Sequence, residues 1–137
     1  MDWLNDTGNN DFTGYEGFIY RIDYTDGSYY FGKKTFIERR KKNFGKKELA
    51  KVTDKRLKTY HMIVKESDWR TYEGSCKDVG DRIIAKKTIL MLCKTKYQLT
   101  FREEELLFNK QVLADDMCLN KCIGGKYWRT VYSDKEK

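Results

Sequence analysis

Proline is entirely missing from this 137-residue sequence, and histidine occurs once. Without proline, an extended linker or a proline-rich tail is excluded, so we expect mostly regular structure. No apolar run approaches the roughly 20 residues that a membrane-spanning helix needs. Residues 1–10 are polar and do not resemble a secretory signal. We therefore expect an intracellular protein with no membrane partner, long enough to bury one core without disulfides or structural metal.

Cysteine is limited to four residues, Cys76, Cys93, Cys118 and Cys122. In an intracellular protein these are expected to be reduced thiols. Cys93 stands in an apolar run, where a single cysteine usually behaves as a small hydrophobic side chain. Cys118 and Cys122 form only one loose pair, whereas structural zinc sites usually show paired knuckles. We predict no structural zinc.

Positive charge is abundant and concentrated. The chain carries a net charge of +7, but residues 33–60 hold twelve Lys or Arg against three acidic residues, a local net of +9. The rest of the chain therefore sums to −2. Such a block is typical of proteins that contact phosphates, although a solvated surface can look similar. Nucleic acid is the favoured partner.

The N-terminal third predicts a lead-in and then a hairpin. Residues 1–14 are rich in Asn, Asp, Gly and Thr and predict a flexible segment, followed by a single domain over residues 15–137. Residues 17–24 read as a strand, and Asp26-Gly27 is a strong turn signal before a return strand that starts at Tyr29.

The remaining elements are predicted mainly as helices. Helices are expected at residues 36–42, 46–59, 77–87 and 100–114, and strands at residues 69–72 and 88–93. Thr100 and Glu103 match a capping box at the start of the last helix. Together these elements predict an α+β fold, with a small central antiparallel or mixed sheet that starts with a β-hairpin and is flanked by helices.

The hairpin carries two short motifs, Phe-Ile-Tyr at residues 18–20 and Tyr-Phe-Gly at residues 30–32. They resemble the signature of the GIY-YIG nuclease superfamily, with Phe in place of the first Gly and of the second Ile. Three further residues stand where that family has an arginine, a metal-binding glutamate and a closing asparagine: Arg40, Glu103 and Asn120. The resemblance implies the GIY-YIG nuclease fold.

A second block sharpens the resemblance. Residues 65–75, with Glu-Ser-Asp-Trp followed by Tyr, Gly and Ser, resemble the phage-encoded, Seg-like homing endonucleases. The likeness runs from about residue 15 to residue 127. One departure concerns histidine: many family members have one four residues after the arginine, where this chain has Phe44. His61 is the only histidine that could take its place.

The resemblance implies a metal-dependent DNA endonuclease that hydrolyses phosphodiester bonds. Tyr20 would accept the proton of the attacking water, and Tyr30 would orient the water or the phosphate. Arg40 suits a phosphate oxygen, and His61 is a further catalytic candidate. Glu103 would hold one Mg²⁺ or Mn²⁺, with waters and phosphate oxygens completing the shell.

The remaining residues of the predicted site contact DNA: Lys33, Lys34, Arg39, Lys41, Lys42 and Asn120. Only about a dozen residues follow Gly125, so we expect no separate DNA-binding module there. Weak site selection is then expected, unless a dimer or a protein partner supplies the rest. A phage-encoded homing enzyme would work in the host cytoplasm.

Two other functions share part of this pattern. A GIY-YIG fold without activity would bind nucleic acid only, and an RNA-directed or ribosome-associated basic protein would show the charge without the motifs. Paired strand tyrosines are often simple sheet formers. Glu103 is explained by the capping box alone, although a helical projection turns it toward the interior, where an ionised carboxylate needs a partner.

Overall fold

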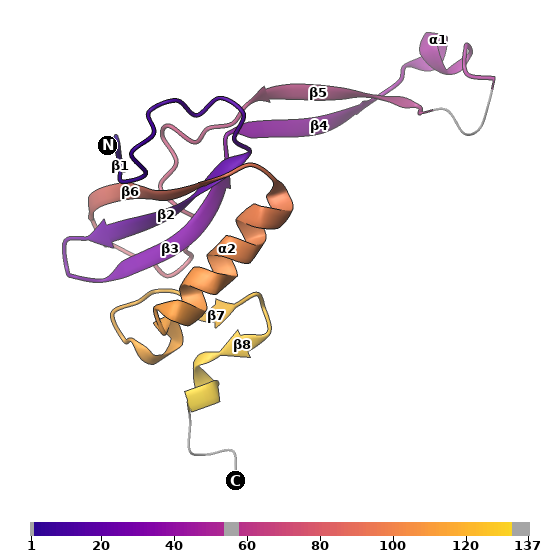
Figure 1. The fold of residues 1–137 in the computed structure, drawn as a ribbon. Coiled ribbons are helices and arrows are strands. Elements are labelled where there is room, and N and C mark those ends of the chain that lie inside the picture. The colour runs from indigo at the N-terminus through magenta and orange to yellow at the C-terminus, as the bar shows by residue number, and fades with distance from the viewer. Residues whose placement is uncertain (1, 54–57, 133–137) are drawn as a thin grey trace. The chain divides into compact units, whose positions relative to one another are not determined.

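A computed structural model describes residues 2–53 and 58–132 of the chain (Figure 1). These residues form two compact units where the sequence predicted one domain. The core unit comprises Met1–Phe36 and Asp68–Lys137, and the ribbon unit comprises Ile37–Ser67. The core unit is an α+β structure with a mixed central sheet, which confirms the predicted fold class. In the described part of the chain, no helix is long and apolar enough to span a membrane.

The central sheet has four strands in the order β1-β6-β2-β3. Their bounds are β1 Trp3–Asn5, β2 Gly17–Tyr24, β3 Tyr29–Thr35 and β6 Ile84–Cys93. Strands β2 and β3 form the predicted hairpin. Its turn is closed by Asp26, whose Oδ1 accepts from the Ser28 amide at 2.9 Å, and by Gly27 at φ +91°. Asp and Gly at this turn therefore act as the sequence indicated.

Residues 1–14, expected as a flexible lead-in, contribute strand β1 instead. This strand pairs in parallel with β6, with Trp3 opposite Lys87. The Trp3 indole N–H also donates to the Trp69 carbonyl at 2.7 Å. An aromatic side chain buries enough apolar surface to offset the ordering of a polar segment, which explains why this stretch joins the sheet.

The two faces of the sheet are covered differently. Helix α2, Lys96–Asn109, covers the face that carries Ile19 and Cys93, and Leu99 packs between them (Figure 1). Cys93 is thus a small core side chain, as predicted. The opposite face carries an aromatic layer, in which rings pack against one another at centroid distances of 5.0–6.0 Å: Trp3, Phe12, Phe18, Phe36 and Trp69.

Helix α2 begins four residues before the predicted start. Its N-cap is Thr95, whose hydroxyl accepts from the Gln98 amide at 3.0 Å. The Thr100–Glu103 capping box is therefore wrong, because both residues lie inside the helix. The helix predicted at residues 77–87 is also wrong: residues 77–83 are turns and irregular structure, and residues 84–87 belong to β6. Residues 69–72, predicted as a strand, form a turn that packs Trp69 into the aromatic layer.

The C-terminal segment closes the core beside α2. Its elements are the 3₁₀ turn η1 Val112–Ala114, strands β7 Cys122–Ile123 and β8 Tyr127–Trp128, and the 3₁₀ turn η2 Arg129–Tyr132. The Arg129 guanidinium donates to four backbone carbonyls of the preceding loop, including Leu113 and Asp115 at 3.0 Å. This one side chain holds the loop together.

The ribbon unit is a two-stranded antiparallel ribbon. Strands β4 Ile37–Asn43 and β5 Tyr60–Glu66 pair along their whole length, and the short helix α1 Lys46–Leu49 follows β4. The helix predicted at residues 36–42 is wrong, since cross-strand pairing decides the structure of a segment without a clear period. The helix predicted at residues 46–59 is limited to α1 in the described part, and residues 54–57 lie outside it.

Candidate active site

Tyr20 lies at the centre of the core unit and is fully buried. Its ring packs between the rings of Trp3, Phe18, Tyr30 and Tyr72, at centroid distances of 5.5–6.3 Å. Within residues 2–53 and 58–132 its hydroxyl finds no hydrogen-bond partner of good geometry. Burial, and then the nearby phenols of Tyr72 and Tyr30, raise the pKa of Tyr20 far above its ordinary value. The surroundings thus keep this phenol neutral and oppose the phenolate that a strong base would need.

Tyr30 shares this face of the sheet, because Tyr20 pairs with Gly32 and Ile22 pairs with Tyr30. The Tyr30 hydroxyl lies 3.3 Å from Ser75 Oγ at the surface. Burial raises its pKa, and the Glu103 carboxylate raises it further, while the Ser75 contact lowers it. Tyr30 therefore stands between the buried phenol of Tyr20 and the surface, and it senses the charge of Glu103.

Glu103 lies on helix α2, whose residues cross the other face of β3. Its side chain is 21% exposed, and burial raises the pKa of its carboxyl group, partly opposed by Lys33. The Lys33 ammonium is 4.0 Å from Glu103 Oε1 and donates to Thr100 Oγ1 at 3.0 Å. Because Thr95 caps the helix, Glu103 has no capping role to explain its half-buried position. Its two neighbours are engaged elsewhere: Glu105 pairs with Arg102, and Glu104 lies against Gly124.

Lys34, the next residue of β3, belongs to the tyrosine face. Its ammonium lies 4.2 Å from the Tyr72 ring centroid and 2.6 Å from Asp68 Oδ1. The hydrogen bond from Lys34 lowers the pKa of Asp68. Lys33 and Lys34, predicted together as DNA contacts, therefore point to opposite faces of the sheet, and each already has an acidic neighbour.

Residues 72–75 complete the surroundings of Tyr20 and were given no role from the sequence. A Cβ on Gly74 would lie 2.9 Å from Ile22 Cδ1, and the backbone at φ +94° is in the left-handed region that favours glycine. Lys87, also buried, donates from Nζ to the Tyr72 carbonyl at 2.8 Å and lies over the Trp3 ring. Burial lowers the pKa of Lys87. The Tyr, Gly and Ser of the Seg-like block were the available signal for this segment.

Asn120 takes a structural position. It is buried, and its amide pairs twice with the backbone of Phe31 on the edge strand β3, at 2.9 Å in each direction. Cys118 also donates to its Oδ1 at 3.2 Å. We therefore give Asn120 no place in the proposed DNA surface.

The other predicted residues belong to the ribbon unit. Arg40 is on β4, opposite Ile63, where the family pattern predicted a helix. His61 on β5 lies with its ring 4.5 Å from the ring of Phe44, the residue at the position where many relatives have histidine. Its Nε2 is 2.8 Å from Glu48 Oε2. Tyr20, Tyr30 and Glu103 thus belong to the core unit, with the two tyrosines on one face of the sheet and Glu103 on the helix at the other face, while Arg40 and His61 belong to the ribbon unit.

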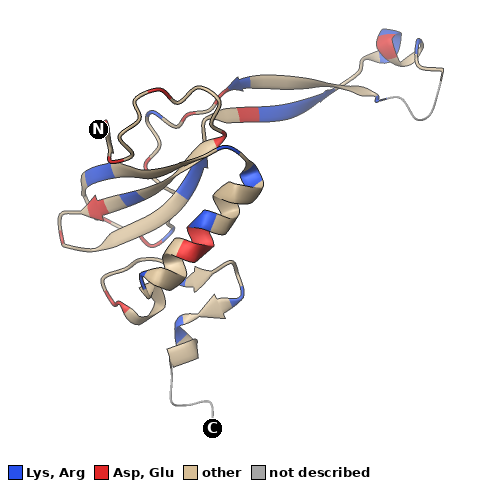
Figure 2. Ribbon diagram, viewed as in Figure 1, with Lys and Arg blue, Asp and Glu red and all other residues tan. Residues whose placement is uncertain are grey.

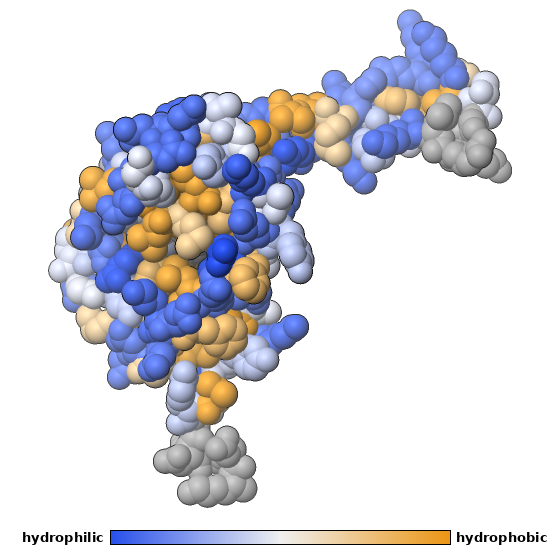
Figure 3. All heavy atoms as spheres, in the orientation of Figure 1, coloured by the Kyte–Doolittle hydropathy of each residue, from blue (hydrophilic) through white to orange (hydrophobic). Residues whose placement is uncertain are grey.

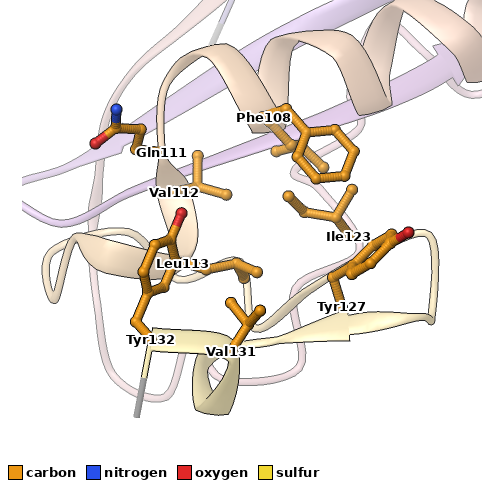
Figure 4. Close-up of a pocket in the computed structure, with 9 residues that line it drawn as sticks. Phe108, Gln111, Val112, Leu113, Ile123, Tyr127, Val131 and Tyr132 are labelled. Atoms are coloured by element: carbon orange, nitrogen blue, oxygen red, sulfur yellow. The ribbon is translucent and has the colours of Figure 1, made fainter. Parts of the chain in front are cut away.

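An apolar pocket of about 240 Å³ lies elsewhere, beneath the C-terminal residues (Figure 4). Its walls include Phe108, Leu113, Tyr127 and Val131. It contains no carboxylate, lysine, arginine or histidine among the described residues that line it, so it offers no charged group to hold a phosphate or a metal ion.

The hairpin carries one tyrosine on each strand, and a helix carboxylate lies beside the edge strand. In an α+β fold, this combination defines a class of nucleases. A family profile described as "Putative endonuclease segE, GIY-YIG domain" matches residues 3–123. The chain therefore belongs to this GIY-YIG endonuclease family, and the resemblance seen in the sequence is confirmed. This membership supports a nuclease domain, and the nuclease family implies a DNA substrate. No curated protein and no solved structure gives a significant match.

GIY-YIG nucleases generally use divalent metal ions. Among the described residues, no three His, Cys, Asp or Glu side chains gather into a metal site. One half-buried carboxylate, destabilised by its burial, is nevertheless sufficient for a hard ion held mostly by water and phosphate oxygens. Glu103 fits that requirement.

Proposed function

We propose that this protein is a divalent-metal-dependent DNA endonuclease that hydrolyses phosphodiester bonds at Tyr20, Tyr30 and Glu103. The observation that carries the proposal is the half-buried Glu103 carboxylate, which burial destabilises and which has no capping role, in the same unit as Tyr20 and Tyr30. A protein that only binds nucleic acid has no use for an acidic group of this kind, because its charge repels phosphates. Retention of Glu103 together with both tyrosines favours the enzyme over the inactive binding module.

In this proposal Tyr20 works as a neutral hydroxyl. Its raised pKa favours the protonated form, so it would orient the attacking water through a hydrogen bond and would not act as a phenolate base. The proton that this water loses would pass to bulk water. Tyr30 and Ser75 extend this set of hydroxyls toward the surface. The role of proton acceptor given to Tyr20 by the family resemblance is changed accordingly.

Glu103 is the proposed ligand of one Mg²⁺ or Mn²⁺. A bound ion of this kind neutralises phosphate charge and lowers the pKa of a bound water. Glu103 would hold it by one oxygen, and Lys33, 4.0 Å away, would contact a neighbouring phosphate. Arg40 as a phosphate ligand and His61 as a further catalytic group rest on the family resemblance alone.

Finer features of the proposal rest on the resemblance of residues 65–75 to Seg-like enzymes. They are a phage origin, a homing role, action inside the host cell, and a dimer or protein partner that assists site selection.

The test is a supercoiled-plasmid assay with EDTA, Mg²⁺ or Mn²⁺. The wild-type chain should cut only with a divalent ion. Glu103→Gln should fold normally, because Thr95 caps the helix, and should not cut. Glu105→Gln is the matched control: the same change on the same helix, at a carboxylate already paired with Arg102, should leave cleavage intact. Cleavage by Glu103→Gln within about tenfold of wild type, only ~1.4 kcal/mol in barrier, would remove Glu103 from the mechanism.

A further inference from the structure

The ribbon unit carries the whole net charge of the chain. Residues 37–67 contain eleven Lys or Arg against four Asp or Glu, a net of +7, while the rest of the chain has seventeen of each. Lys and Arg colour much of β4 (Figure 2). Long-range attraction to a polyanion therefore comes mainly from this unit, while single cations of the core unit such as Lys33 act only at short range.

The shape of the ribbon fits one groove of DNA. Strands β4 and β5 are seven residues each and form a sheet of two strands only. At about 3.4 Å per residue, the paired region is about 24 Å long. The major groove of B-form DNA is about 12 Å wide and admits a two-stranded β-ribbon. A ribbon of this length would follow roughly seven base pairs, at about 3.4 Å each.

The two faces of the ribbon differ in chemistry. Paired residues point to the same side, so Met62 and Val64 share a face with Lys41 and Arg39. Met62 is 50% exposed and Val64 58%, and hydrophobic atoms are visible on the surface of this unit between hydrophilic ones (Figure 3). On this face the Lys41 ammonium lies 4.6 Å from the ring centroid of Tyr60.

The opposite face is neutralised in part. Its Glu38 pairs with Lys65 at 3.5 Å, and its His61 contacts Glu48. Its other described cations are Arg40 and Lys42. The first face carries Glu66 as well, and it is distinguished by its exposed apolar side chains, which stand beside the cations Arg39 and Lys41. Base edges and phosphates together require this combination.

We propose that the ribbon unit is the DNA-reading element of this nuclease and lies in the major groove with the Met62–Val64 face toward the bases. Met62 and Val64 contact thymine methyl groups, and the flanking cations contact phosphates on the groove walls. This inference rests on DNA being the substrate, as in the proposed function. It replaces the expectation of weak site selection, because the reading element is inserted within the nuclease domain.

Double-stranded RNA is disfavoured by the same geometry. The major groove of A-form RNA is deep and too narrow for side chains to read, and RNA has no thymine methyl. A ribbon that reads bases with apolar side chains is therefore suited to duplex DNA.

The first experiment measures binding in EDTA, so its outcome is independent of cleavage. Duplexes with a randomised core are enriched by binding to the full chain. We expect a motif of about seven base pairs or fewer that includes A·T pairs. Uracil in place of thymine in the enriched duplex should weaken binding about tenfold, which is in the range of one mismatched base pair. The absence of a motif, a motif without A·T pairs, or equal binding of the uracil duplex and of duplex RNA would each overturn the proposal.

The second experiment changes the face without changing the ribbon. Met62→Gln with Val64→Thr keeps size and strand propensity while removing the apolar contacts, and should abolish the preference for thymine over uracil. The matched control makes the same two changes at exposed residues of the core unit, Met117→Gln with Val131→Thr, and should keep the preference. Self-association that the ribbon variant abolishes would assign the face to a second copy of the chain and overturn the proposal.

The third experiment tests the charges. Neutralising Arg39 and Lys41 to glutamine should flatten the salt dependence of binding, with the log–log slope falling by roughly one for each phosphate that is no longer bound. An unchanged slope would overturn the placement of the ribbon on DNA. If the wild-type chain binds DNA with these properties but does not cut it with any divalent ion, the proposed function fails while this inference stands.

Discussion

Gly32→Ala is the change that should disturb Tyr20 most directly. An added Cβ would lie 2.3 Å from the Tyr20 hydroxyl oxygen and 2.4 Å from its Cζ. Non-bonded contacts of this kind settle near about 3.5 Å, so the ring or strand β3 must move by about 1 Å. The ring has little room, because Tyr20 is fully buried among four other aromatic rings. Overpacking of this kind costs about 1–3 kcal/mol.

The same displacement should reduce cleavage more than it reduces stability. A misplacement of about 1 Å in a catalytic arrangement can cost roughly 100-fold in rate. At this chain length, each kcal/mol of stability removed should lower the melting temperature by about 3–5 °C. The assay combines thermal melting with initial rates of plasmid cleavage, both measured on the full chain.

Gly45→Ala provides the control. Gly45 has φ −74°, and an added Cβ meets nothing within 4 Å, so the variant should melt and cut as the wild type does. The reasoning about Tyr20 is refuted if Gly32→Ala also melts at the wild-type temperature and cuts within about threefold of the wild-type rate, well below the loss expected for a displaced catalytic group.

The remaining predictions concern Tyr20, Glu103, Asn120 and zinc. Tyr20→Phe should lose cleavage but gain stability in urea unfolding, because an unpartnered hydroxyl is removed. Tyr24→Phe is the control, since it removes a similar hydroxyl, and burial raises the pKa of Tyr24 to about 12. This control variant should gain stability and keep cleaving. Because the pKa of Glu103 is raised in the folded state, its protonated form stabilises the fold below the ordinary pKa of 4.5, and this stabilisation is lost as the pH rises through the folded-state pKa. Without metal, Glu103→Gln should therefore be more stable than the wild type at pH 7. The difference in unfolding free energy between the two chains should close below pH 4.5. Asn120→Ala should cost about 2–4 kcal/mol, because the Phe31 amide and carbonyl lose their partners, while the affinity for DNA stays unchanged; reduced affinity in the folded variant would restore Asn120 as a DNA contact. Metal analysis of the chelator-free protein should find no zinc, and one tightly held zinc per chain would make Cys118 and Cys122 ligands.

The hairpin could be predicted because its signals are local. Asp26 and Gly27 encode the turn, and alternating residues encode strand β2, so no distant contact is needed. The start of α2 shows the limit of such reasoning. Thr95 with Gln98 and Thr100 with Glu103 both fit the spacing of a capping box, and only the structure selects the first.

Elements that depend on distant partners could not be predicted in the same way. Strand β1 exists because β6 offers an edge and Trp3 fills the aromatic layer, and neither is visible in residues 1–14 alone. Strand β4 is made of residues with little strand preference, and it forms because β5 pairs with all seven of them.

The motif places Tyr20 and Tyr30 on one face of the hairpin, with ring centroids 6.3 Å apart, and the charge of Glu103 acts on Tyr30. Their catalytic roles stay a prediction, and the features of their surroundings that depend on packing could not be predicted from the sequence. The raised pKa of Tyr20 follows from its complete burial among other phenols, which spacing in the sequence does not reveal. The contribution of Ser75 requires the turn at residues 69–72 to place it beside Tyr30.

The ribbon unit leaves and re-enters the core at neighbouring points. Phe36 precedes it and Trp69 follows it, and their rings are 5.0 Å apart within the aromatic layer. The core unit therefore holds the two ends of the 31-residue insertion close together. Replacing them with a four-residue turn would lower the loop-closure cost by about 2 kcal/mol. A core with such ends can accept ribbons of other sequence and length, so under the proposed function the choice of DNA site can change without alteration of Tyr20, Tyr30 or Glu103.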